Sequence, residues 1–310
     1  MKDYHSGLHH ISVIAGDPQQ NAEFYVHVLG MRLVKKSVNQ DDPGTYHLFY
    51  GNAKGDPGSG LTFFPWPMAR QGKPGSGEAV KVALSVPKGS LEFWAKHLSE
   101  KGVDFDGSYD RFGQEAIGFK DPDGLYLELV LDDLADEYAA WDGGGVEPEY
   151  GIRGFRGTTL RLAEAEPTAE LLSRLFGYEE MSRSGHSIFY SVGAPLGGSV
   201  IIVENGKPHP VNGRGTVHHI AFRARDREDL MRLREEVLHL GLHPTEVIDR
   251  HWFYSVYFRT PGGVLFELAT DGPGYAVDED PDKLGQKLIL PPWLESRRAQ
   301  IETRLPEIHI

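Results

Sequence analysis

Two pairs of adjacent histidines open short apolar stretches in distant parts of the chain. The first pair lies in LHHISVIAGD (8–17) and the second in VHHIAF (217–222). A carboxylate, Glu267, lies in a third apolar stretch, VLFELA. Two histidines and one carboxylate, with other coordination positions left open, are typical of non-haem Fe(II) oxygenases. If folding brings one histidine of each pair to Glu267, the sequence predicts a metal site of this kind.

Strand geometry limits which side chains can reach such a site. Successive side chains of a strand point to opposite faces, so only one histidine of each pair is expected in the concave side of a sheet. The other would point to the opposite face or support the site from the edge. A structural zinc site usually closes all four positions with Cys or His. The chain has no cysteine, which also excludes disulfides and Cys nucleophiles.

An internal repeat shows which elements must position these residues. At a constant offset of 139 residues, VDFDGSYDRFGQEAIGFKDPDGLYLELV aligns without a gap on LHPTEVIDRHWFYSVYFRTPGGVLFELA. A weaker repeat at an offset of 147 lays Gly30 on Gly177. The chain therefore contains four units, and matches at fixed offsets indicate repeated modules. Their limits are 7–67, 78–133, 152–204 and 214–272.

Only two of the four units carry histidines at the critical strand. His219 falls on Val80 at offset 139, and His10 falls on Gly157 at offset 147. We therefore expect the first unit to pair with the fourth around one ion, and the second to pair with the third without a metal. Glu128, the repeat mate of Glu267, has no such histidine in its own unit, so a glutamate here can also be a structural residue.

Each unit is predicted to be βαβββ, which makes the chain an α+β protein with four such modules. An alternating strand such as 82–86 is followed by a helical stretch such as 21–30 or 91–102, and a glycine ends each helix. Three further strands complete the unit. The predicted division is an N-terminal domain at 1–135, a linker at 136–151, a C-terminal domain at 152–272 and a tail at 273–310. The tail should pack on the body, with a helix over 294–305.

Composition excludes several classes of protein. The 310 residues suit about two domains, and the net charge is −13, with no Lys/Arg cluster for nucleic acid or an anionic membrane surface. There is no apolar signal-peptide core and no stretch near the length of a membrane span. We expect a soluble, cytoplasmic protein without nucleic-acid or membrane partners. The sequence leaves its oligomeric state open, a homo-oligomer included.

Beyond these patterns, the chain resembles a known family nearly from end to end. The matching stretches are LHHISVIAGD, NQDDPGTYHLFYG, LTFFPWP, VHHIAF, DRHWFYSVYFRTPGGVLFELATD and LGQKLILPPWLE. They resemble the vicinal oxygen chelate superfamily (glyoxalase, bleomycin resistance and extradiol dioxygenase proteins), and most closely its hydroquinone-type ring-cleaving dioxygenases. The resemblance implies barrels built from the modules and names the metal ligands as His10, His219 and Glu267. It also implies supporting or catalytic roles for His9, Ser12, His218, Arg250 and Tyr257.

The implied activity is Fe(II)-dependent, extradiol-type cleavage of a hydroquinone- or catechol-like ring, with O2 as co-substrate and a small aromatic as substrate. Mn(II) suits the same ligands. Tyr257 would face the cavity as an acid, a base or a substrate anchor, unless it only packs. His218 and His9 could shuttle protons or be structural, and Ser12 keeps the hydroxyl of a Thr found in some relatives. Arg250 could stabilise anions, yet Arg111 repeats it in a unit without histidines.

Aromatic residues near the motifs could line an apolar pocket or belong to the core: Phe63, Phe64, Trp66, Trp252 and Phe253. Two other functions compete with the dioxygenase. A glyoxalase-like metal-dependent isomerase or lyase would want a fourth carboxylate or amide ligand on the last strand of the first unit, which reads GLTFFPWP and has none. A metal-free small-molecule or drug-binding protein would not need two histidines and a glutamate.

Overall fold

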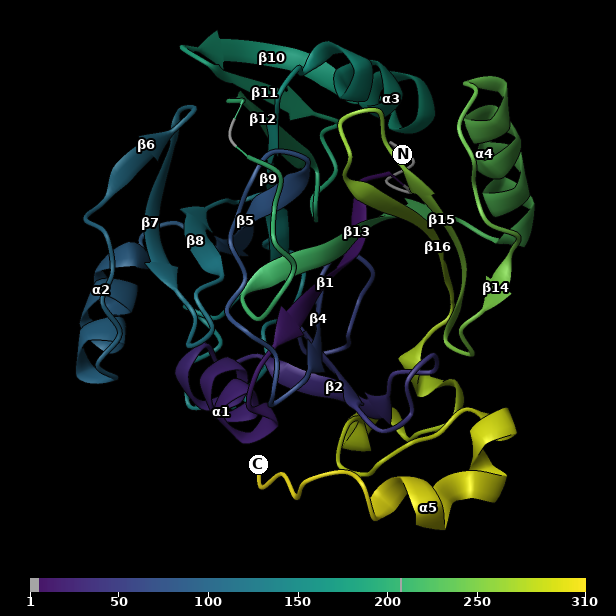
Figure 1. Cartoon of the computed structure of the whole chain (residues 1–310). Coiled ribbons are helices and arrows are strands. Elements are labelled where there is room, and N and C mark those ends of the chain that lie inside the picture. Colours follow the sequence, from purple (N-terminus) through teal and green to yellow (C-terminus); the bar gives the residue numbers. More distant parts are fainter. Residues whose placement is uncertain (1–5, 207) are drawn as a thin grey trace.

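The computed structural model describes residues 6–206 and 208–310 and is built around two curled eight-stranded sheets (Figure 1). The strand order of the first sheet is β14-β15-β16-β13-β1-β4-β3-β2, which joins the fourth unit to the first. The order of the second sheet is β10-β11-β12-β9-β5-β8-β7-β6, which joins the third unit to the second. The predicted α+β fold of four modules, and the predicted pairing of the units, are confirmed. The division into domains at the stated boundaries stays a prediction.

Each sheet thus combines strands from both halves of the chain. The first sheet contains β1 (Leu8–Ala15), β2 (Arg32–Val38), β3 (Tyr46–Gly51), β4 (Gly60–Pro65), β13 (Thr216–Ala224), β14 (Ile248–Asp249), β15 (Phe253–Arg259) and β16 (Leu265–Pro273). The second contains β5 (Glu78–Val86), β6 (Tyr109–Arg111), β7 (Gln114–Lys120), β8 (Tyr126–Leu131), β9 (Gly154–Leu162), β10 (Glu179–Ser184), β11 (Ser187–Ser191) and β12 (Ser199–Glu204). In the middle of the first sheet, β1 runs antiparallel to β13 and parallel to β4.

A helix follows the first strand of every unit, as predicted. These are α1 (Pro18–Glu23) with its π-helical continuation η1 (Phe24–Val28), α2 (Leu91–Glu100), α3 (Glu166–Phe176) and α4 (Arg227–His239). The first helix begins earlier than expected, because Asp17 caps it by accepting a hydrogen bond from the Gln20 N–H. Glycines with positive φ follow all four helices, at 67°, 72°, 73° and 75° for Gly30, Gly102, Gly177 and Gly241. Among the described residues, no helix has the length and apolarity needed to cross a membrane.

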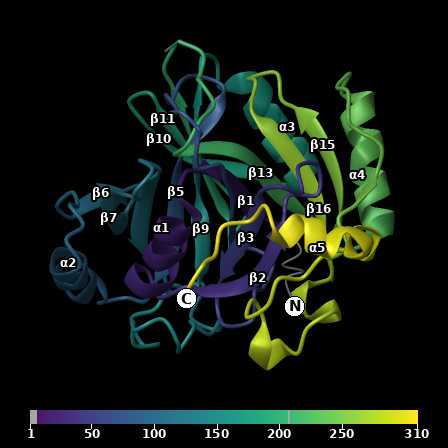
Figure 2. The same ribbon diagram turned by 60° about the horizontal axis from the view of Figure 1, so that its bottom comes forward.

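The C-terminal tail packs against the edge of the first sheet that β2 forms (Figure 2). Val38 of β2 lies in one apolar cluster with Leu290, Leu294 and Ile301. The tail contains the 3-10 helices η2 (Tyr275–Val277), η3 (Pro281–Lys283) and η4 (Pro292–Arg297) and the short α5 (Arg298–Glu302). The single helix expected over 294–305 is therefore replaced by a 3-10 segment and one α-helical turn.

Candidate metal centre and active site

Three buried side chains of the first sheet converge on one point. Glu267 Oε2 on β16 lies 3.1 Å from His10 Nε2 on β1 and 2.8 Å from His219 Nε2 on β13. The two Nε2 atoms are 3.3 Å apart. Within the described part of the chain, no other group of three His, Asp or Glu residues brings its ligand atoms so close. The structure therefore brings together the three residues that the sequence singled out as metal ligands.

The donor set fits a divalent cation. Glu267 Oε2 is buried and makes no contact with the geometry of a hydrogen bond, although both imidazoles face it. Burial would raise the pKa of Glu267, but the imidazoles of His10 and His219 hold it well below its usual range. Burial lowers the pKa of His219, which favours the neutral ring. Two imidazole nitrogens and a carboxylate oxygen that lie this close together, with no hydrogen bond at that oxygen, form a donor set suited to a bound metal ion.

Two β-bulges bring the first histidine of each pair beside the second. Leu8 pairs with Phe222 and His10 with Ala221, so His9 has no partner in β13; in the same ladder His218 is skipped between His219 and Val217. A bulge re-aims a side chain that strict alternation would send to the other face. The expectation that only one histidine of each pair faces the site is wrong for the second pair, since His218 and His219 line the same cavity. In the first pair only His10 lines that cavity, and His9 supports it as expected.

These bulges give both ligand histidines the same support. His9 Nδ1 lies 2.9 Å from His10 Nδ1, and His218 Nδ1 lies 2.7 Å from His219 Nδ1. A partner on one ring nitrogen fixes the orientation of the other, which here leaves Nε2 for the centre. Burial, with the neighbouring histidine, lowers the pKa of His9 to about 3 and that of His218 to about 4. Both rings are therefore neutral near pH 7.

Tyr257 lies directly beside the carboxylate. It pairs with Glu267 between β15 and β16, and its ring centroid is 5.5 Å from that of His219. Burial and the charge of Glu267 raise its pKa, so the hydroxyl keeps its proton. The Arg250 guanidinium lies 5.5 Å from the Tyr257 ring centroid and 3.1 Å from an Asp41 oxygen. The structure thus places both predicted residues at one wall of the site.

Three polar side chains of β1, β4 and β3 form a chain of contacts in the same sheet. Ser12 Oγ is 2.7 Å from Thr62 Oγ1, which is 2.9 Å from His47 Nε2. Ser12 and Thr62 are fully buried. Burial holds the pKa of His47 well below its usual range. Ser12 was predicted from the sequence, whereas its two partners were not, because the three side chains come from three different strands.

The centre opens into an aromatic cavity of about 350 Å³. Its lining includes His10, His47, Phe49, Phe64, Trp66, His218, His219, Arg250, Trp252, Phe253 and Tyr257. Four of the five aromatic residues named from the sequence therefore line the cavity. Phe63 does not, since its ring lies 4.5 Å from that of Tyr25 in the core; its neighbour Phe64 takes the cavity face. Such a cavity suits a small ring.

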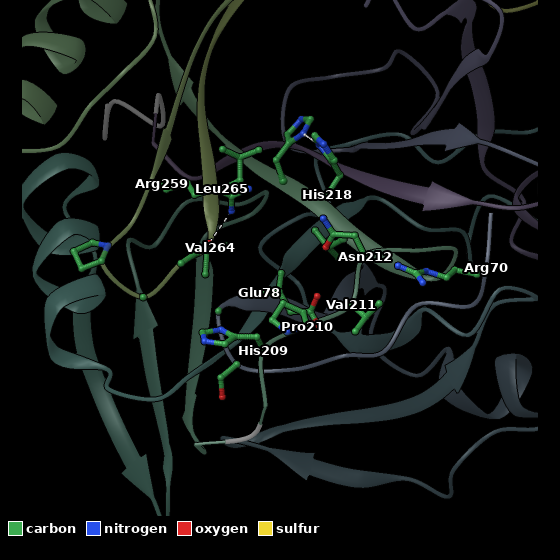
Figure 3. A pocket seen from close by; sticks show the side chains of 18 residues that line it. Arg70, Glu78, His209, Pro210, Val211, Asn212, His218, Arg259, Val264 and Leu265 are labelled. Carbon is green, nitrogen blue, oxygen red and sulfur yellow. Dashed lines mark hydrogen bonds between the residues drawn. The ribbon is translucent and has the colours of Figure 1, made fainter. Parts of the chain in front are cut away.

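A second, more polar cavity of about 600 Å³ lies against the same strands (Figure 3). Glu78, His209 and Asn212 are among its lining residues. His218, His219 and Leu265 line both cavities and therefore form the wall between them. Only the smaller cavity also contacts His10 and the aromatic rings, so it is the better candidate for the substrate site although it is not the larger.

The C-terminal tail supports the wall of the aromatic cavity. Asp278 Oδ2 accepts hydrogen bonds from Trp252 Nε1 and His251 Nε2, both at 2.9 Å. The fully buried Lys35 lies 2.6 Å from the other oxygen of the same carboxylate. The tail packs on the body as predicted, and it also positions a loop that carries cavity residues.

Several known proteins resemble this chain in sequence and in fold. The family model described as the Glyoxalase/Bleomycin resistance protein/Dioxygenase superfamily matches residues 7–129 and 158–268. The chain is 43% identical to "Putative ring-cleaving dioxygenase MhqO" of Bacillus subtilis (strain 168), covering 96% of this chain and 95% of that protein. It is 36% identical to the "Chlorohydroquinone/hydroquinone 1,2-dioxygenase" of Sphingobium indicum, over 95% of this chain and 94% of that one. The crystal structure of a "putative dioxygenase from Bacillus subtilis" matches with a TM-score of 0.93 at 42% identity, covering 98% and 97% of the two chains.

Proposed function

Since the chain belongs to the glyoxalase/bleomycin resistance protein/dioxygenase superfamily, we propose that it is a non-haem Fe(II)-dependent, extradiol-type dioxygenase that opens hydroquinone- or catechol-like rings. One observation carries the proposal: His10, His219 and Glu267 converge beside an aromatic cavity, with a buried carboxylate oxygen that lacks a hydrogen-bond partner. The names of the relatives support a hydroxylated aromatic ring as the substrate.

In this proposal His10, His219 and Glu267 hold the ion, and Mn(II) could take the place of Fe(II). When bound, the metal would supply a Lewis-acid and redox centre that brings the phenol oxygen and O2 together. The remaining work belongs to the cavity. Phe64, Trp252 and the other ring side chains exclude water and hold the substrate ring in a fixed orientation, which lowers the entropic part of the barrier.

Tyr257 is the strongest candidate for proton transfer or substrate anchoring. Its raised pKa makes it a donor that stays protonated at neutral pH. Arg250 beside its ring offers a positive charge for the anion that forms as the ring opens. His218 lines the cavity as a neutral ring and can accept a proton, whereas His9 and Ser12 position other residues.

The proposal is tested by oxygen uptake of the protein loaded anaerobically with Fe(II). Methyl- and chlorohydroquinones and catechols are the substrates, and His219→Ala is the control. Uptake together with a ring-opened product, both absent in the control, is the expected result. Iron binding without uptake for any ring would refute the dioxygenase and favour the isomerase, which a thiol–aldehyde assay would then detect. No metal binding at all would favour the metal-free binding protein.

A further inference from the structure

The two halves of the first sheet build the same position in two different ways. In the parallel pair β13–β16, Glu267 lies opposite Ala221, two residues after His219. In the parallel pair β1–β4, Thr62 lies opposite Ser12, two residues after His10. Thr62 is therefore to His10 what Glu267 is to His219. If the site followed this internal symmetry fully, it would hold two histidines and two carboxylates.

The neighbouring strands repeat the correspondence. Tyr257 of β15 pairs with Glu267, and Phe49 of β3 pairs with Thr62. Two residues before each of these lies the side chain that supports the position. Ser255 Oγ donates a hydrogen bond to Glu267 Oε1, and His47 Nε2 lies 2.9 Å from Thr62 Oγ1. The two halves therefore share a support from the adjacent strand and differ in what it holds.

The Thr62 hydroxyl lies within hydrogen-bonding distance of two other side chains. It is fully buried, and its hydroxyl lies between Ser12 Oγ at 2.7 Å and His47 Nε2 at 2.9 Å. A hydroxyl has one proton and two lone pairs, so these two contacts fix its orientation. Its side chain is also shorter than a glutamate by two heavy atoms of reach. A threonine held in this way leaves the first unit without a metal-ligating side chain at the position that Glu267 occupies in the fourth.

We infer that Thr62, held by Ser12 and His47, is the residue that determines the chemistry of the site, because it keeps the metal at three protein ligands. This inference rests on the proposed function. Ring cleavage needs free positions at the ion for both substrate and O2. A carboxylate at residue 62 would occupy one of them and would add a negative charge that weakens the ion as a Lewis acid.

The test compares three substitutions at one position. Thr62→Glu supplies the fourth ligand, Thr62→Gln has the same length without the charge, and Thr62→Val removes the hydroxyl and keeps the shape. We expect Thr62→Glu to bind Fe(II) or Mn(II) about tenfold or more tightly than wild type in competition with a chelator. Its oxygen uptake with hydroquinone should fall by about 10²-fold or more, because a position needed by the reactants is filled. Thr62→Val should stay within about threefold of the wild-type metal affinity.

Equal metal affinity for Thr62→Glu and Thr62→Val would overturn the inference, because the carboxylate would then not reach the ion. Wild-type oxygen uptake by a tight-binding Thr62→Glu would overturn it as well. If the extra volume prevents folding, His47→Ala/Thr62→Glu provides room and is judged against His47→Ala by the same affinity measurement. Failure of the proposed function looks different: wild type takes up no oxygen, while the order of metal affinities still decides the role of Thr62.

Discussion

The two sheets contain the same buried glutamate and neutralise it in different ways. Glu267 of the first sheet faces two imidazoles and keeps an oxygen without a hydrogen-bond partner. Its repeat mate Glu128 in the second sheet accepts from Lys81 Nζ at 2.9 Å, Arg111 Nε at 2.9 Å and the Tyr109 hydroxyl at 2.7 Å. A buried carboxylate needs a cation. The second sheet supplies it from its own side chains, whereas in the first sheet we propose that a metal ion supplies it.

In the second sheet, glycines take the places of two residues of the centre. Gly157 occupies the position of His10, and a Cβ built there would lie 2.0 Å from the Ser199 carbonyl oxygen. Gly118 occupies the position of Tyr257, and a Cβ there would lie 2.3 Å from the Tyr126 hydroxyl. Repeated strands therefore preserve the fold, while the side chains that fill the concave face decide whether it can hold a ligand.

Arg111 and Arg250, which occupy equivalent positions of the repeat, also differ in their contacts. Arg111 is bound to Glu128, whereas Arg250 pairs with Asp41 and lies over Tyr257. Because Arg111 repeats Arg250 in the sequence, both arginines could have had a structural role. In the structure only Arg111 contacts the glutamate of its own unit. Arg250 does not bind Glu267 and lines the cavity instead. The cation at Glu267 would be the proposed metal ion.

The largest effect on activity is expected when Glu267, but not its repeat mate Glu128, is replaced by glutamine. Glu267→Gln removes the anionic ligand and should lower oxygen uptake by about 10³-fold or more, together with a loss of metal affinity. Glu128→Gln should leave both within about twofold, since the distant residue does not touch the centre. Oxygen uptake and chelator competition on both variants measure the contrast. Equal losses in the two variants would show that the sheets are not functionally distinct.

Glu128→Gln should instead cost stability. The guanidinium of Arg111 is 3% exposed, and without the carboxylate it would be a buried, uncompensated charge. We expect the free energy of unfolding to fall by about 3–5 kcal/mol. Urea unfolding measures this, with Lys81→Met/Arg111→Met/Glu128→Leu as the matched control. The triple variant should recover most of the loss; if it is as unstable as Glu128→Gln, shape and not charge explains the effect.

The sequence was informative where a repeat could be compared with itself. The four units followed from matches at fixed offsets, and the pairing of the first with the fourth followed from which units carry the His-His pairs. That His10 and His219 are the ligands within those pairs was implied by the family resemblance. The bulges at His9 and His218 did not, because a bulge depends on the register between strands about two hundred residues apart. The roles of the site residues, the domain boundaries, the cytoplasmic location and the oligomeric state stay predictions.

Residues whose roles depend on contacts with distant parts of the chain could not be predicted from the sequence either. His47 and Thr62 meet Ser12 only after β3, β4 and β1 are side by side, and no local spacing encodes that contact. Asp278 reaches Trp252 from a tail that has no counterpart in the repeat. Phe63 was a different case, since alternation along β4 already excluded it once Phe64 faced the cavity.

A smaller effect is expected at Tyr257, whose repeat mate in the second sheet is Gly118. Tyr257→Phe keeps the ring that packs against His219 and removes only the hydroxyl. If the hydroxyl transfers a proton, kcat should fall by about 10²-fold with little change in metal affinity. Steady-state oxygen uptake over a range of substrate concentrations separates kcat from KM. A change in KM alone would assign the hydroxyl to substrate anchoring, and no change in either would leave the residue a purely packing role.

The smallest effect should come from the support of the carboxylate. Ser255 donates a hydrogen bond to Glu267 Oε1, and its repeat mate in the second sheet is Ala116, which offers Glu128 no such bond. Ser255→Ala therefore gives the first sheet the residue of the second. Metal affinity should fall about tenfold, because a ligand without its supporting hydrogen bond is less well oriented and less confined. Chelator competition measures the loss, and Ala116→Ser, which adds the hydroxyl to the sheet without a centre, should leave metal affinity unchanged. An unchanged affinity in Ser255→Ala would mean that the two imidazoles alone fix the carboxylate, and that the sheets differ only at the ligands themselves.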